Sequence, residues 1–196
     1  ADYDPWMDKL LSAAAAPGRT TRVAADLVGR KSGDNPHLWY DPATFPAVAA
    51  ALAAELAKRD PADAAEFSAN LETFNQDFAT ATAGIAAIKA AHAGVKVTAT
   101  EPVFGYMAAA MGLDMLNQRF QLAVMNETEP SASDVAAFED SLKSGTAKFL
   151  FYNSQVTDET TTRLLALANA AKVPVIGVTE TEPGGQTIQS WFAGQI

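Results

Sequence analysis

The sequence contains no cysteine among its 196 residues. It therefore has no disulfide framework, no thiolate ligands for zinc and no thiol nucleophile. Long apolar runs are absent as well, because no segment approaches the roughly 18 consecutive apolar residues that a membrane-spanning helix needs. These absences exclude a disulfide-stapled fold and a cysteine-based zinc site, and they predict no membrane insertion of this chain.

Basic residues are also scarce. Lys and Arg total 14 against 23 Asp and Glu, which gives a formal net charge of -9 at pH 7 and a pI near 4.6. A nucleic acid or an anionic membrane surface would require a basic face, so neither is expected as a partner. Cations are the more natural ligands. With 48% hydrophobic and 19% charged residues, the composition is otherwise that of a globular protein with a packed core.

The opening part of the chain predicts little regular structure. Residues 5–16 predict a short helix, and residues 21–28 predict a strand followed by a turn. The next segment reads Asp34-Asn35-Pro36-His37-Leu38-Trp39-Tyr40-Asp41-Pro42. Because each proline biases the preceding residue away from the helical region, we expect a stiff, extended turn that presents His37. Such a loop suits a metal-binding or catalytic side chain; the alternative is a buried histidine that is merely hydrogen-bonded.

Two helices are predicted next. Apolar residues at helical spacing follow Ala43 and stop at Asp60-Pro61, where Asp60 is expected to cap the second helix. That helix extends to Gly94 with one continuous apolar stripe, over roughly 29 residues or about 43 Å. The chain offers no second helix with a matching apolar stripe for a coiled coil. We therefore favour a helix that joins two lobes as a spine, rather than a coiled-coil arm. The other histidine, His92, lies in its last turn, where a partial positive charge suits the helix dipole.

Strands and helices alternate after Gly94. The strand-like segments are residues 95–100, 120–124, 148–152 and 173–178. The helical segments between them are residues 103–111, 131–144 and 157–171. Ser131 and Asp134 resemble a capping box at the start of a helix. This alternation predicts an α/β fold with a parallel, doubly wound sheet of at least four strands.

Polar residues follow each predicted strand at its carboxyl end, where ligands bind in open α/β sheets. The clusters are Thr100-Glu101, Asn126-Glu127, Asn153-Ser154-Gln155 and Thr179-Glu180. Glu101 and Glu180, taken with His37, offer one imidazole nitrogen and several carboxylate oxygens. This set suits a divalent cation such as Mn²⁺, Zn²⁺ or Fe²⁺ and disfavours copper(I). The same carboxylates would also serve as an acid/base pair, but no nucleophile motif or phosphate-binding glycine loop supports a particular reaction.

Several motifs in combination resemble the zinc/manganese solute-binding proteins of ABC transporters, the TroA/ZnuA-like type. They are residues 35–42, 100–106, 126–131, 152–155 and 178–181, with Trp191 beyond them. The resemblance extends over essentially the whole chain. It implies a fold of two α/β lobes with parallel sheets joined by one long rigid helix, and a metal ion held in the cleft between the lobes for delivery to a membrane permease.

The resemblance also implies a set of metal ligands. By position, His37 matches the second metal histidine of the family, Glu101 the third ligand and Glu180 the last carboxylate. The third ligand is a histidine in many zinc-preferring members and a glutamate in manganese-type members. The last carboxylate is commonly an aspartate, so Glu180 has a longer arm, and Glu182 is the alternative ligand.

One departure from the family concerns the start of the chain. Family members begin with a strand-rich region that carries the first metal histidine, and nothing in this sequence corresponds to it. We therefore expect an incomplete first lobe: residues 1–59 as its remnant, 60–94 as the linking helix and 95–196 as the C-terminal α/β lobe. Without the first histidine, metal binding is expected to be weaker than in an intact relative.

The expected function is binding of Mn²⁺ or Zn²⁺, with Fe²⁺ as a further compatible ion, for delivery to an ABC transporter permease, without catalysis. The expected location is the periplasm, with the signal peptide absent from this chain. Two alternatives stay open: a metal-dependent hydrolase on a doubly wound sheet, and a surface adhesin or scaffold with a structural metal.

Overall fold

The computed structural model describes residues 4–156 and 159–196. The chain divides into two compact units, Ala1–Thr80 and Ala81–Ile196, and the boundary falls inside one continuous helix, α4 (Ala64–His92). Each unit is described by itself, since the position of one relative to the other is not determined. The finer division into a lobe remnant, a linking helix and a C-terminal lobe stays a prediction. In the described ranges, no helix combines the length and apolar character that a membrane span requires.

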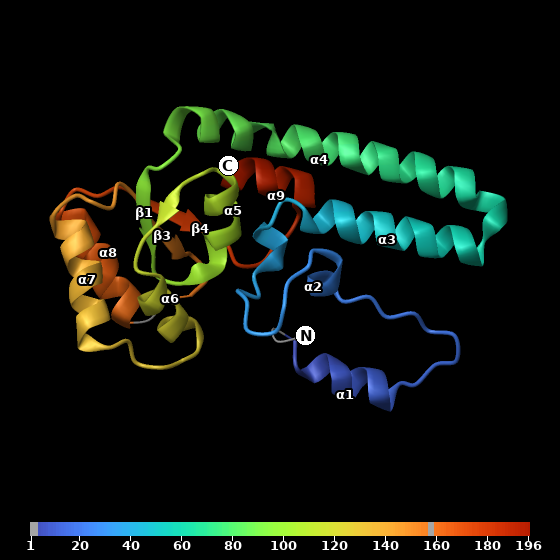
Figure 1. Cartoon of the computed structure of the whole chain (residues 1–196), viewed down its shortest axis with the longest axis horizontal. Coiled ribbons are helices and arrows are strands. Elements are labelled where there is room, and N and C mark those ends of the chain that lie inside the picture. The colour runs from blue at the N-terminus through green and yellow to red at the C-terminus, as the bar shows by residue number, and fades with distance from the viewer. Residues whose placement is uncertain (1–3, 157–158) are drawn as a thin grey trace. The chain divides into compact units, whose positions relative to one another are not determined.

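The described part of the first unit is helical (Figure 1). Its elements are α1 (Trp6–Ala13), α2 (Ala24–Leu27), the 3-10 turn η1 (Leu38–Tyr40), α3 (Thr44–Arg59), the 3-10 turn η2 (Pro61–Asp63) and the first part of α4. The strand predicted for residues 21–28 is wrong, because α2 occupies that place. Its backbone N–H groups bond locally, from Asp26 to the Val23 carbonyl and from Val28 to the Ala25 carbonyl. A strand would need a neighbouring strand, and the described residues of this unit contain none.

Helices α3 and α4 run antiparallel within the first unit (Figure 1). Phe78 of α4 joins them, with its ring 5.9 Å from that of Phe45 and 5.8 Å from that of Phe74. The predicted length of α4 is confirmed at 29 residues. Asp60 does lie between the helices, but its side chain makes no capping bond. With one residue separating α3 from η2, the Asp60 backbone N–H instead completes α3 by bonding the Leu56 carbonyl.

The second unit contains a parallel sheet, which confirms the predicted fold class. Its described strands are β1 (Lys96–Ala99), β2 (Asp114–Met115), β3 (Leu150–Asn153) and β4 (Val175–Val178), in the order β2-β1-β3-β4. The strand predicted for residues 120–124 is wrong, because helix α6 (Gln118–Met125) occupies them. Phe120 and Val124 both contact the core, and their spacing of four fits one face of a helix. The two-residue strand β2 takes the edge position instead.

Helices flank this sheet. They are the 3-10 turn η3 (Pro102–Phe104), α5 (Gly105–Ala110), α6, α7 (Ala132–Lys143), α8 (Glu159–Ala170) and α9 (Ile188–Gln195). The predicted start of the α8 segment at Thr157 lies outside the described residues. Helices α7 and α8 run side by side (Figure 1) and, with α6 and β3, enclose a core that includes Phe138, Leu150 and Leu164. This core holds the sheet, and therefore its carboxyl edge, in place.

Ser131 caps the N-terminus of helix α7, as the sequence pattern predicts. Its Oγ accepts a hydrogen bond from the backbone N–H of Asp134 at 3.2 Å. Losing such a cap costs about 1 kcal/mol of folding free energy. We expect Ser131→Ala to lower the free energy of unfolding by about that amount in denaturant titrations. Ser68→Ala, on the exposed side of α4, is the control, and an equal loss there would contradict the capping role.

The same cap has a pH dependence. The Ser131 hydroxyl donates to the Asp134 carboxylate, and this bond, followed by the contact with Arg119, lowers the pKa of Asp134 from its ordinary value of 3.8. A carboxyl group whose pKa is lowered by folding stabilises the fold above its ordinary pKa, and this stabilisation is lost as the pH falls through the folded-state value. The stability difference between wild type and Ser131→Ala should therefore narrow below pH 3.8.

Candidate metal centre

The order of the strands defines where this sheet can bind a ligand. The chain leaves β1 toward β2 on one side and later returns to place β3 on the other side. In such sheets the crevice lies at the carboxyl ends of the strands where the order reverses, which here are β1 and β3. Thr100-Glu101 follows β1, Asn153 ends β3, and Thr179-Glu180 follows β4. Three of the four predicted polar clusters therefore share one edge of the sheet.

The fourth predicted cluster, Asn126-Glu127, does not follow a strand. Both residues instead follow helix α6. The backbone N–H of Asn126 bonds the Leu122 carbonyl, and Glu127 turns the chain with a φ of 53°. The pair therefore ends a helix, and its assignment to a strand end is wrong.

Glu101 is held by the backbone on both sides. Thr100, before it, is buried and extends the pairing with β3 by donating its N–H to the Phe151 carbonyl at 3.0 Å. Glu101 itself is half-buried and extended, with φ -152° and ψ 167°, and Pro102 then begins η3. The Glu101 side chain does not cap that turn. This geometry places a carboxylate at the carboxyl end of β1.

Glu180 is held by its side chain. The amide Nδ2 of Asn153 donates to Glu180 Oε2 at 2.7 Å, across from the neighbouring strand end. The backbone around Glu180 is also fixed: Ser154 donates from its N–H and its Oγ to the Val178 carbonyl, and Gln155 Oε1 accepts from the N–H of Thr181 at 2.8 Å. We call this set, Asn153, Ser154 and Gln155 bonded to residues 178–181, the β3–β4 clamp.

Helix α9 fixes the segment between β4 and Glu180 from the other side. Trp191 Nε1 donates to Thr179 Oγ1 at 2.7 Å, and Gln195 Oε1 accepts from the Thr179 N–H at 3.1 Å. The helix begins with a capping box between Thr187 and Ser190. Trp191 is thus a support for the segment that carries Glu180.

His37, in the first unit, is oriented by Asn35. The side-chain oxygen of Asn35 lies 2.6 Å from His37 Nδ1 and also accepts from the His37 backbone N–H at 3.1 Å. An amide oxygen can only accept, so Nδ1 carries a proton, and in the neutral ring the lone pair is then on Nε2. The ring is buried and makes an edge contact with Trp39, with centroids 5.3 Å apart. The segment is not simply extended as predicted, since η1 follows His37 directly.

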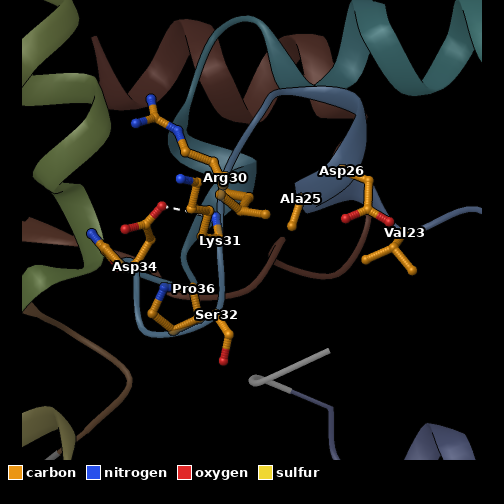
Figure 2. A pocket seen from close by; sticks show the side chains of 10 residues that line it. Val23, Ala25, Asp26, Arg30, Lys31, Ser32, Asp34 and Pro36 are labelled. Atoms are coloured by element: carbon orange, nitrogen blue, oxygen red, sulfur yellow. Dashed lines mark hydrogen bonds between the residues drawn. The ribbon is translucent and has the colours of Figure 1, made fainter.

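A cavity of about 410 Å³ adjoins the segment that holds His37 (Figure 2). Asn35, Pro36 and Leu38 line it, whereas His37 does not. Both signs of charge line the cavity, with Asp26 opposite Lys31 in the view of Figure 2. Figure 2 also shows Asp34 accepting from the Lys31 backbone N–H, at 2.9 Å. The mixed charge gives the cavity no preference for a cation, so we do not assign it as the metal site.

The comparisons with known proteins decide the family. The sequence matches the family described as "ZnuA: Zinc-uptake complex component A periplasmic" over residues 1–195. The chain belongs to this family. A comparison with curated protein sequences finds no match.

Three solved structures illustrate the likeness in fold. The solute-binding protein FpvC from Pseudomonas aeruginosa, in complex with Mn²⁺, has a TM-score of 0.73 at 17% identity, covering 98% of this chain and 72% of that chain. A ZnuA crystal structure has a TM-score of 0.70 at 20% identity, covering 98% and 72%. The periplasmic zinc-binding protein TroA from Treponema pallidum has a TM-score of 0.69 at 17% identity, covering 95% and 71%. At these identities the likeness establishes the fold.

The ZnuA family is a class of metal-binding proteins for uptake and not a class of enzymes. In this ZnuA-family chain, His37 lies in one unit, and Glu101 and Glu180 lie in the other. Within residues 4–156 and 159–196, no three His, Asp or Glu side chains form a group that could hold a metal ion. A set drawn from both units depends on their relative position, so His37, Glu101 and Glu180 stay predicted ligands.

The supporting amides of this ZnuA-family site were not predicted from the sequence. Asn35 and Asn153 both lie in sequence motifs that resemble the family, but their roles as partners of His37 and Glu180 emerge only from the structure. A signal does exist for Asn35, because asparagine side chains commonly bond the backbone two residues on. The clamp, in contrast, joins residues 27 positions apart in the sequence, and no local pattern indicates it.

We expect Asn35→Ala to weaken metal binding by about 10- to 100-fold, the usual effect of losing a residue that orients a metal-binding histidine. The His37 ring would lose the acceptor that sets its tautomer and direction. Isothermal titration calorimetry of the metal-stripped protein measures the change. Asn169→Ala, exposed on α8, is the control and should bind as wild type does; similar affinities for both variants would contradict the role of Asn35.

Proposed function

We propose that this chain binds one divalent transition metal ion, Mn²⁺ or Zn²⁺, through His37, Glu101 and Glu180, and delivers it to the permease of an ABC transporter in the periplasm. Fe²⁺ is a further compatible ion. Membership of the zinc-uptake family supports metal binding for transport. Relatives of the same fold whose structures are described with zinc or with Mn²⁺ support a divalent ion as the cargo.

The observation that carries the proposal is the pair of amide supports. Asn35 bonds His37 Nδ1, and Asn153 bonds Glu180 Oε2, in separate units of the chain. Partners of this kind typically accompany metal ligands, because they fix the direction and protonation state of the ligand before the ion arrives. His37 and Glu180 therefore each have an orienting partner.

The donor set also agrees with the two metals proposed. Carboxylate oxygens suit Mn²⁺ and imidazole suits Zn²⁺, so two carboxylates with one imidazole fit Mn²⁺ by hardness. At nitrogen and oxygen sites in general, Zn²⁺ binds more tightly than Mn²⁺. We therefore propose Zn²⁺ as the tighter ligand in a binding experiment, and Mn²⁺ as an ion that the same residues accept.

Calorimetric titration of the metal-stripped chain with Zn²⁺ and Mn²⁺ separately tests the proposal. Saturable binding with one ion per chain is the expected result. Absence of binding for both ions, with the protein folded by circular dichroism, would contradict it. Delivery is tested separately, by measuring whether the metal-loaded chain stimulates the ATPase activity of a cognate permease complex reconstituted in vesicles.

A further inference from the structure

Asn153 has a role that goes beyond supporting one ligand. We propose that Asn153 is a positioning residue that biases the site toward Zn²⁺ over Mn²⁺ by holding Glu180 to coordination through a single oxygen. This inference rests on the proposed function, because it concerns the same metal site.

The direction of the Asn153 amide is fixed by its two partners. Its Oδ1 accepts from the backbone N–H of Gln155 at 3.0 Å, and its Nδ2 donates to Glu180 Oε2 at 2.7 Å. A flipped amide would place an NH₂ group against the Gln155 N–H and an oxygen against the carboxylate, so both contacts would be lost. Asn153 is also buried, with 2% of its surface exposed. The donor facing Glu180 is therefore built into the fold.

The β3–β4 clamp restricts the backbone around Glu180 as well. The Val178 carbonyl accepts from Ser154, and Thr181 bonds Gln155 through its N–H, its carbonyl and its hydroxyl. A glutamate side chain normally has considerable rotamer freedom, which is lost when it is ordered. Here a hydrogen bond holds the carboxylate at Oε2, and further hydrogen bonds hold the main chain at Val178 and Thr181. Glu180 is therefore oriented before a metal binds.

The bond to Oε2 acts differently on the two metals. A carboxylate that binds an ion through both oxygens must turn both of them toward it, and this rotation strains the charge-assisted hydrogen bond from Asn153. Zn²⁺ is usually four-coordinate and tetrahedral, so it needs only one oxygen from each carboxylate. Mn²⁺ suits octahedral, oxygen-rich sites and gains from the second oxygen. The hydrogen bond from Asn153 to Oε2 therefore lowers the affinity for Mn²⁺ relative to the affinity for Zn²⁺.

Zn²⁺ and Mn²⁺ titrations of wild type, Asn153→Ala and Ser154→Ala test this inference. We expect Asn153→Ala to weaken Zn²⁺ binding by about 10- to 100-fold and Mn²⁺ binding by clearly less, so that the ratio of the two dissociation constants shifts toward Mn²⁺. Asn169→Ala, an exposed position on α8 outside the clamp, is the control and should leave the ratio unchanged, whereas Ser154→Ala reports the effect of loosening the main chain alone. Absorption of bound Co²⁺ gives an independent readout, since a rise in coordination number weakens its visible bands.

Asn153→Asp is the second variant, in case Asn153→Ala does not fold. An aspartate keeps an acceptor for the Gln155 N–H but presents an oxygen to Glu180 in place of the donor, so the ratio should again shift toward Mn²⁺. An unchanged ratio in the folded variants would overturn the inference, even if both affinities fell together, because it would give Asn153 a purely structural role. A wild-type chain that binds neither ion would contradict the proposed function itself, and the wild-type titration alone reports that result.

Discussion

His37→Ala is expected to reduce Zn²⁺ affinity by more than about 100-fold, which exceeds the usual effect of losing an outer partner such as Asn35. Imidazole is the donor of the set that suits zinc best, so Mn²⁺ binding should fall by less. Asn35 would still be present, but it would have no ring nitrogen to orient. Calorimetry with both ions measures the two effects, and competition with a chelator of known affinity extends the range for Zn²⁺.

The matched control for this variant is His92→Ala. The sequence contains two histidines, and His92 lies exposed in the last turn of α4. Both variants remove one imidazole, so nonspecific binding of zinc to histidine would fall equally in the two. Equal losses would contradict the assignment of His37. Because His37 is buried, thermal unfolding of the metal-free variants should be compared first, so that a loss of fold is not counted as a loss of ligand.

Glu101→Gln is expected to show the opposite ranking. The substitution keeps the shape of the side chain but removes its charge, and hard Mn²⁺ depends more on carboxylate oxygens than Zn²⁺ does. We expect Mn²⁺ affinity to fall by more than about 100-fold, again beyond the effect of an outer partner, with a smaller fall for Zn²⁺. Titration of the metal-stripped variant with each ion measures both values.

Glu127→Gln provides the control for charge. Glu127 is an exposed glutamate of the same unit, and it follows helix α6 and not a strand. Its substitution changes the net charge by the same amount and should leave both affinities unchanged. If Glu101→Gln keeps full affinity while a hydrolytic activity disappears, the site is catalytic and the transport function is wrong. If both glutamine variants bind as wild type does, Glu101 is not a ligand.

The long helix and most of the sheet are predictable from the sequence, for different reasons. The apolar stripe of α4 repeats over enough turns that no other structure fits it, and its 29 residues agree with the prediction. Strands β1, β3 and β4 each follow a turn signal and consist mainly of apolar, β-branched or aromatic residues. The error at residues 120–124 arises because a short apolar run fits a buried strand and a short helix equally well. Strand β2 has only two residues, too few for any alternation to be visible.

The candidate site also has a part that the sequence predicts and a part that it does not. His37, Glu101 and Glu180 can be proposed as ligands from the sequence alone, because their residue types and the motifs around them are local properties of the sequence. The partners that orient them depend on contacts made only after folding, such as Asn153 with Glu180 and Trp191 with Thr179. Neither pair is joined by a periodic pattern. The strand order that brings Glu101 and Glu180 to one edge of the sheet is likewise a result of the pairing of β1 with β3 and of β3 with β4.

The β3–β4 clamp has a consequence for the repeated use of the protein. A carrier that loads and unloads many times must recover its empty form quickly after each release. Because the clamp bonds join protein groups to one another, the segment that carries Glu180 is ordered by the folding of the chain and does not wait for cargo. The conformational entropy of that segment is therefore lost when the chain folds. Each later cycle of metal binding and release does not repeat that loss.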